Sequence, residues 1–251
     1  MEEIEQILNK FNAIQLEAIQ DAALMDRIDT KFAFNRDYAE EIILSLKEHY
    51  NVLEVNGNRI GNYESLYFDE EDFTFYKDHH NNKSHRFKVR FRKYVESEKY
   101  FLEVKEKRKG RVKKKRIPVK KFERNLSETS KEFIQQQLDT PVNLEPKLWN
   151  QYKRITLISL NKKERLTLDF DLVFEWNNEK SSYGDLVIAE LKQKRRDRSS
   201  PFYMMMKNQN IRPYRVSKYC IGAVDLYHKK EFKYNRFKKK LLKLKKISNA
   251  T

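Results

Sequence analysis

The stretch RFKVRFRKY, residues 86–94, alternates cations with apolar side chains and decides the fold of this chain. The even positions are basic and the odd positions up to 91 are apolar: Arg86, Lys88, Arg90 and Arg92 against Phe87, Val89 and Phe91. Successive side chains of a β-strand point to opposite faces of the sheet. The stretch therefore predicts a strand with a row of cations on one face and an apolar surface on the other.

The same alternation recurs in at least five further segments. Their polar or charged positions are Asp29 and Lys31; Glu103, Lys105 and Lys107; Lys114 and Arg116; Thr167, Asp169 and Asp171; and Glu190 and Lys192. For one strand, an antiparallel sheet with one solvated face explains the pattern. Over six strands, the density of charge favours a sheet closed into a barrel, because closure lets the charges meet one another and a polar ligand. We expect an α+β fold, an antiparallel β-barrel that forms a charged tunnel with amphipathic helices packed around the outside.

Helical periodicity appears outside these strands. It predicts helices over residues 2–23, 37–49 and 130–138, and a further one within 200–208. The polar stretch at 77–85 is typical of a hairpin loop, so His79 and His80 are expected at the surface. No Pro/Gly/Ser-rich linker divides the chain. We expect one domain over residues 1–228, followed by a basic C-terminal helix or tail at 229–251.

The composition excludes several classes of protein. The chain has 251 residues with a net charge of +16, and its 16 Phe and 14 Tyr argue against general disorder. No apolar run approaches the roughly 18 residues of a membrane span. One cysteine excludes a disulfide framework, and five glycines fit no glycine-rich phosphate loop. The sequence predicts a soluble, cytoplasmic protein with an anionic partner.

Cations that converge with a few carboxylates suit a polyphosphate chain and a divalent metal. Arginine holds phosphate oxygens through two parallel hydrogen bonds, and lysine supplies a point charge. Carboxylates would repel phosphate in direct contact, so they imply Mg²⁺ or Mn²⁺ between the two. Phosphoryl transfer then needs little beyond positioning and neutralisation of charge.

Nine short segments follow one another along the chain in an informative order. They are DTKF (29–32), YFD (67–69), KVRFRKY (88–94), FLEVKEK (101–107), VKKKRIPV (112–119), YKRITL (152–157), RLTLDFDL (165–172), VIAELKQ (187–193) and SKY (217–219). This ordered set resembles a VTC domain, the polyphosphate polymerase module named after the vacuolar transporter chaperone complex. That family lies within the CYTH-like group of triphosphate tunnel enzymes. Residues 29–31, Asp-Thr-Lys, stand where the triphosphatase branch carries ExExK, which favours the VTC branch.

The resemblance implies roles for individual residues. The phosphate ligands and catalytic cations would be Lys31, Arg90, Arg92, Lys105, Lys114, Arg116, Arg154, Lys192 and Lys218. Glu190 would be the principal metal ligand, assisted by Glu103 or Asp169. Ser217, beside Lys218, and Lys107 are assigned to binding of the ligand near the phosphates.

Three functions are compatible with these patterns. The first is a polymerase that transfers the terminal phosphate of ATP to a polyphosphate chain with Mn²⁺ or Mg²⁺. The second is a tunnel triphosphatase that hydrolyses triphosphate or a nucleoside triphosphate, and the third is a non-catalytic binder of polyphosphate or nucleic acid. We expect no specific nucleic acid partner, because carboxylates within the cationic rows would weaken its binding. Membrane association would require a separate membrane partner or the basic C-terminal tail.

Overall fold

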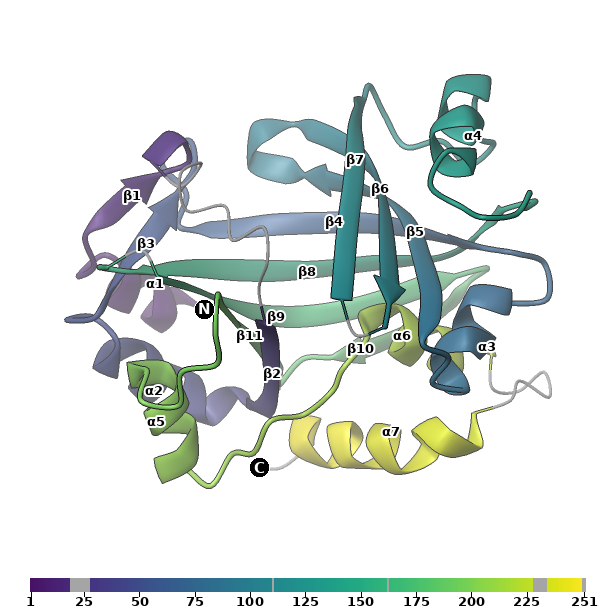
Figure 1. Ribbon diagram of the computed structural model, residues 1–251. Coiled ribbons are helices and arrows are strands. Elements are labelled where there is room, and N and C mark those ends of the chain that lie inside the picture. The colour runs from purple at the N-terminus through teal and green to yellow at the C-terminus, as the bar shows by residue number, and fades with distance from the viewer. Residues whose placement is uncertain (19–27, 110, 162, 228–233, 250–251) are drawn as a thin grey trace.

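An eleven-stranded sheet forms the body of the protein (Figure 1). The computed structural model describes residues 1–18, 28–109, 111–161, 163–227 and 234–249. The strands are β1 (Ala13–Gln15), β2 (Ile28–Asn35), β3 (Tyr50–Glu54), β4 (Ile60–Asp69), β5 (His85–Tyr94), β6 (Lys99–Arg108), β7 (Arg111–Val119), β8 (Glu145–Ser159), β9 (Glu164–Trp176), β10 (Glu179–Tyr183) and β11 (Leu186–Gln193). The helices are α1 (Glu2–Leu8), α2 (Ala39–Ser45), α3 (Thr74–His80), α4 (Glu128–Gln135), α5 (Pro201–Asn208), α6 (Lys218–Tyr227) and α7 (Asn235–Ser248), with short 3₁₀ turns η2 (Arg36–Tyr38) and η3 (Val95–Ser97).

The main strands pair in the order β2-β11-β9-β8-β4-β5-β6-β7. Every neighbouring pair along this path is antiparallel, whereas β1 and β3 pair in parallel at the side of the sheet. The sheet curls so that β5, β6 and β7 stand across the long strands β4, β8 and β9 (Figure 1). Within the described part of the chain, β2 and β7 are not hydrogen-bonded to each other, so the sheet is a half-barrel. The predicted α+β fold, an antiparallel barrel-like sheet with helices packed around it, is confirmed, with the barrel open between β2 and β7 in the described chain.

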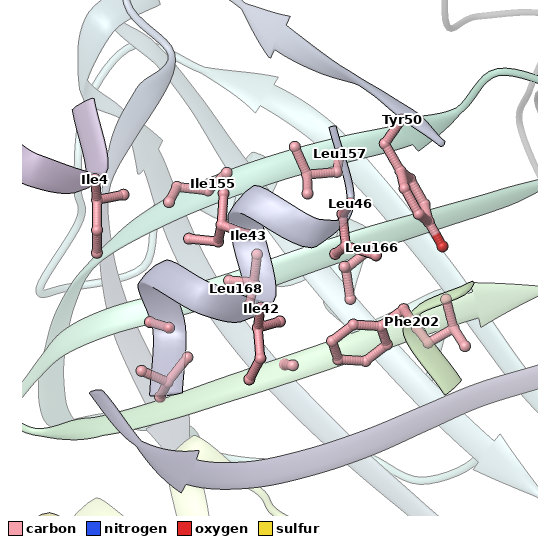
Figure 2. Close-up of a cluster of buried hydrophobic side chains, with 14 of the residues drawn as sticks. Ile4, Ile42, Ile43, Leu46, Tyr50, Ile155, Leu157, Leu166, Leu168 and Phe202 are labelled. Atoms are coloured by element: carbon pink, nitrogen blue, oxygen red, sulfur yellow. The ribbon is translucent and has the colours of Figure 1, made fainter. Parts of the chain in front are cut away.

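The convex side of the sheet is apolar and covered by helices, as the alternation predicts. Under α1, α2 and α5, one cluster joins Ile42 and Phe202 to the sheet residues Ile155, Leu166 and Leu168 (Figure 2). A second part of the same face packs beneath α4. Its buried members include Leu66, Val89, Phe91, Leu102 and Ile134.

The concave side is apolar at one end. There α6 and α7 pack into the curl and bury Tyr219, Leu241 and Leu244 together with Ala33 of β2 and Ile188 of β11. Charged side chains are therefore confined to the remaining length of the concave surface. Among the described residues, no helix combines the length and the apolar character needed to cross a bilayer.

A β-bulge corrects the predicted alternation of residues 165–172. The register between β8 and β9 shifts at Gln151/Lys153, and the opposing Asp171 has a φ of 51°. Asp169 therefore points into the curl, whereas Asp171 pairs outside it with Arg36 at 3.0 Å and Lys153 at 3.1 Å. The extra residue of a bulge reverses the side-chain alternation beyond it, so Leu172 joins the concave apolar cluster.

One helix prediction and one loop prediction also need correction. The helix expected over residues 2–23 ends at Leu8, and β1 begins at Ala13; residues 19–23 lie outside the described chain. The stretch expected as a hairpin loop contains α3, and His80 at its end is buried. His80 Nε2 accepts a hydrogen bond from the backbone N–H of Arg236, a contact that helical periodicity alone does not reveal.

The close approach of α6 to β9 provides a test of the fold. A Cβ added at Gly222 would lie 2.4 Å from Cδ1 of the buried Phe174. We expect Gly222→Ala to lower the free energy of unfolding by about 1–3 kcal/mol through overpacking. Gly184→Ala is the matched control, because a Cβ there meets no atom within 4 Å. Equal unfolding midpoints for the two variants in urea would contradict this packing.

Candidate functional site: a cation-lined concave surface

Three buried or half-buried carboxylates lie on the concave surface, and each is held by two cations. They are Glu103 of β6, Asp169 of β9 and Glu190 of β11. Their side chains are 3%, 3% and 14% exposed, respectively. Burial of a charge is unfavourable unless it is paired, so these contacts are required for the carboxylates to remain ionised.

Glu103 lies between β5 and β7, opposite Arg90 and Arg116. Arg90 donates from Nη2 at 2.7 Å and from Nε at 3.0 Å to Glu103 Oε2, and Lys114 pairs with Oε1. Burial acts to raise the pKa of Glu103, but Arg90, Arg92 and Lys114 hold it well below its usual value. Glu103 is therefore an ionised group that orders the cations around it.

Asp169 accepts a bidentate pair of hydrogen bonds from an arginine on the neighbouring strand. Arg154 of β8 donates from Nε to Oδ1 at 2.5 Å and from Nη2 to Oδ2 at 2.8 Å. Lys218, the first residue of α6, pairs with Oδ2. Burial opposes ionisation of Asp169, yet Arg154 and Lys218 lower its pKa well below the usual value.

Glu190 is the most exposed of the three carboxylates. It lies opposite Lys31 of β2 in the register, and its two oxygens pair with Lys31 and Lys192. The distance from Lys192 Nζ to Glu190 Oε2 is 2.6 Å, and Lys192 also donates to Thr167 Oγ1 at 3.2 Å. Lys31, Lys192 and Glu190 therefore form one charged group on the β2–β11 side of the curl.

Two half-buried cations, Lys88 of β5 and Lys105 of β6, face each other in the register. Neither has a carboxylate within ion-pair distance in the described part of the chain. Burial lowers the pKa of both amines, and cationic neighbours, Arg90 among them, lower it further. Burial also lowers the pKa of Lys31, and the positive charge of Lys105, on the opposite side of the curl, lowers it further. An anion placed among these groups would favour their charged forms.

A layer of tyrosines supports the arginines. The Arg154 guanidinium lies 5.0 Å from the ring centre of Tyr63 and 5.2 Å from that of Tyr152. Arg92 donates to the Tyr152 hydroxyl at 2.7 Å, and Arg90 donates to the Tyr67 hydroxyl at 3.0 Å. Stacking and hydrogen bonding hold the planar guanidinium groups in place.

Sequence reasoning missed these tyrosines as part of the site. The alternation of Tyr63, Ser65 and Tyr67 along β4 was the available signal. Aromatic residues on strands are common in cores, however. Only the curled sheet places Tyr63, Ser65 and Tyr67 on the same face as the arginines. Ser65 contacts Arg92, whose Nε donates to the serine hydroxyl at 3.4 Å.

The remaining predicted residues lie at the periphery of the concave surface. Arg116 is exposed on β7 and stacks on Phe101 with 4.4 Å from guanidinium carbon to ring centre. Lys107 is half-buried and pairs in register with Arg86. Ser217 precedes α6, and its hydroxyl accepts from the N–H of Cys220, so it caps the helix that carries Lys218.

The donor set restricts the kind of metal site that these residues can form. In the described ranges, no group of three or more His, Cys, Asp or Glu side chains is arranged to hold a metal ion. Magnesium is commonly bound by one or two carboxylates together with substrate phosphates. The concave surface fits such a shared site, with Glu190 as the more accessible carboxylate, and does not fit an all-protein cage.

The titration of Lys114 provides a test of the site. Burial lowers its pKa to about 8, although Glu103 acts to raise it. Lys114 is therefore cationic below about pH 8, and we expect affinity for inorganic triphosphate to fall about tenfold as the pH rises from about 7 to about 9. Lys114→Arg keeps its charge and should flatten this profile in calorimetric titrations.

Lys113→Arg is the control, because Lys113 is exposed on the same strand and alternates with Lys114. Comparison of variants at each pH removes the contribution of the ligand's own ionisation. A pH profile of Lys114→Arg that matched the unaltered protein would contradict a contribution of Lys114 to anion binding.

Comparison with solved structures finds several of similar shape but low sequence identity. A proposed adenylyl cyclase from Hippeastrum, described as having a dominant triphosphatase activity, is 13% identical, with 78% of this chain and 94% of that chain covered and a TM-score of 0.48. A proposed adenylate cyclase from Bacillus halodurans is 13% identical, with 77% of this chain and 96% of that chain covered and a TM-score of 0.47. A proposed adenylate cyclase from Vibrio parahaemolyticus is 10% identical, with 75% of this chain and 94% of that chain covered and a TM-score of 0.46.

Comparison with curated proteins finds no match. The family model of the VTC domain, in contrast, matches residues 26–227. That range contains the ten strands from β2 to β11, and it includes every cation and carboxylate that the concave surface is described with. The order of the short segments predicted this result, and the chain belongs to the VTC domain family.

Proposed function

We propose that the protein is a metal-dependent polyphosphate polymerase that transfers the terminal phosphoryl group of ATP to a polyphosphate chain. Membership of the VTC domain family supports a triphosphate ligand on the concave surface. The observation that carries the proposal is the excess of cations over carboxylates there, with Lys88 and Lys105 outside ion-pair distance of every carboxylate in the described chain. A linear chain of phosphates supplies the missing negative charge along several strands at once.

The proposed reaction is an in-line transfer between two phosphates. A terminal oxygen of the polyphosphate chain attacks the γ-phosphorus of ATP, the bond from that phosphorus to the β–γ bridging oxygen breaks, and ADP leaves with the bond's electron pair. A new phosphoanhydride bond forms, so the chain gains one phosphate. Arg90, Arg92 and Arg154 would bind phosphate oxygens, and Lys31, Lys105 and Lys114 would neutralise charge.

The remaining assignments extend the same surface. Lys192 and Lys218 would position phosphates next to Glu190 and Asp169, with Arg116, Lys107 and Ser217 at the periphery. Mn²⁺ or Mg²⁺, held by Glu190 and phosphate oxygens with Glu103 or Asp169 assisting, would neutralise negative charge on the transferred group. The exposure of Glu190, 14% against 3% for the other two, supports it as the principal ligand.

The lowered pKa values of Glu103 and Asp169 support a phosphate acceptor over water. Water must lose a proton as it attacks, and a general base assists best when its pKa lies near the working pH. The pKa values of Glu103 and Asp169 are instead well below their usual range, because cations surround both groups. The terminal oxygen of polyphosphate is already ionised near neutral pH and needs no such base.

The first test is incubation of the full chain with ATP and Mn²⁺ or Mg²⁺. We expect polymer that stains on a gel for polyphosphate, together with ADP in equal amount to the phosphate incorporated. Free phosphate without polymer would overturn the polymerase proposal in favour of a triphosphatase. Binding of polyphosphate without turnover under either metal would instead support a non-catalytic binder.

The second test removes the proposed metal ligand. Glu190→Gln should lower metal-dependent turnover by about 100-fold or more, because an amide holds a divalent cation poorly. It should retain polyphosphate affinity, since Lys31 and Lys192 stay cationic. Glu175→Gln, at an exposed position of β9, is the matched control and should leave turnover unchanged. Full turnover in Glu190→Gln would remove Glu190 from the metal site.

A further inference from the structure

The solvent face of α7 is cationic along its whole length. The sequence of α7, NRFKKKLLKLKKIS, contains no acidic residue. We define the basic face by the exposed cations that form no ion pair within the described part of the chain: Arg236, Lys238, Lys239, Lys243 and Lys246. A neighbouring exposed cation of α7, Lys245, pairs with Asp225 at 3.1 Å. The basic face therefore carries charge that no carboxylate of the described residues compensates by an ion pair.

The opposite face of α7 anchors the helix to the body. Leu241 and Leu244 are buried in the concave apolar cluster, and Phe237 packs on the ring of Tyr76. At the C-terminal end, Asn35 Nδ2 donates to the carbonyl oxygen of Ile247 at 2.8 Å. These contacts prevent rotation of the helix, which lies at the periphery of the molecule (Figure 1). The basic face is consequently held toward solvent as one fixed surface.

An apolar side chain projects from the middle of this surface. Leu242 is 59% exposed, the largest value among the large hydrophobic residues that the structure describes. It lies one helical turn from Lys238 and Lys246 and next to Lys243 along the chain. At a lipid headgroup layer, an exposed leucine can enter the acyl boundary while the ammonium groups of the lysines around it remain among the headgroups.

The composition of the basic face selects among anionic partners. Four of its five cations are lysines, which are strongly hydrated point charges on flexible stems. Lysine is depleted in protein–protein interfaces, where arginine and aromatic residues predominate. Clusters of lysine are, however, well suited to the diffuse negative potential of an anionic bilayer. A rigid helix with one exposed leucine therefore fits a lipid surface better than a folded protein partner.

We propose that the basic face of α7, with Leu242, docks the protein reversibly on an anionic lipid surface. The apolar face of α7 is occupied within the protein, so attraction between charges supplies most of the binding, and salt should weaken it. This proposal does not rest on the proposed function, because the basic face belongs to a different surface from the carboxylates and their cations.

The test is co-sedimentation of the full chain with vesicles. We expect binding to phosphatidylcholine vesicles that contain phosphatidylglycerol, release as salt is raised, and no binding to pure phosphatidylcholine. The variant Lys238→Gln, Lys239→Gln, Lys243→Gln and Lys246→Gln should lose about 100-fold or more in affinity, because each basic residue near the surface contributes about fivefold. Glutamine favours helix nearly as well as lysine, so the unfolding midpoint should be retained.

A control variant removes the same charge from another surface. Lys113, Lys115, Lys120 and Lys121 are all exposed on or just after β7, and their replacement by Gln should leave vesicle binding intact. Equal losses in the two variants would overturn the proposal, because net charge alone would then explain binding. Failure of the unaltered protein to bind the mixed vesicles would also overturn it. So would an α7 variant that binds these vesicles normally but binds long-chain polyphosphate weakly.

Discussion

The structure depends on the pairing of buried carboxylates with cations across the concave surface. Glu103, Asp169 and Glu190 are each held by two cations. These come from neighbouring strands or from α6, except Lys192, which lies on the same strand as Glu190. A buried carboxylate without such partners would be protonated or would destabilise the fold by several kcal/mol. The pairs neutralise the carboxylates but not the whole surface, since additional lysines remain. These lysines repel one another across the concave surface, so a bound anion should stabilise the folded protein.

The opposite side of the same strands supplies the stability that this arrangement requires. Apolar residues alternate with the charged ones and are buried under α1, α2, α4 and α5. The helices keep water from the convex face, and burial of the apolar side chains between helices and sheet drives folding. Because the convex face of each strand supplies the stability, the residues on the concave face can be charged without loss of the apolar core.

The helices α6 and α7 lie on the concave side of the sheet, next to the charged residues. The apolar residues of both fill one end of the curl, and the first residue of α6, Lys218, reaches Asp169. α7 buries Leu241 and Leu244 while its lysines stay outside. The large positive charge of the chain is thus divided between an enclosed surface, where phosphate is the proposed ligand, and an exposed helix with a separate proposed role.

The alternation in residues 86–94 was sufficient to predict which side chains of β5 share a face, because the two-residue period of a strand is a local property. The same reasoning succeeded for β2, β6, β7 and β11. It was wrong beyond Asp169, where one bulge residue reverses the faces, and it missed His80, whose burial depends on α7. Apart from the bulge, the amino-acid sequence is enough to assign the charged and the apolar face of each of these strands. The pairing of cations with carboxylates, such as Lys218 with Asp169, depends on the folded chain, because curling of the sheet and docking of α6 bring together residues far apart in the sequence.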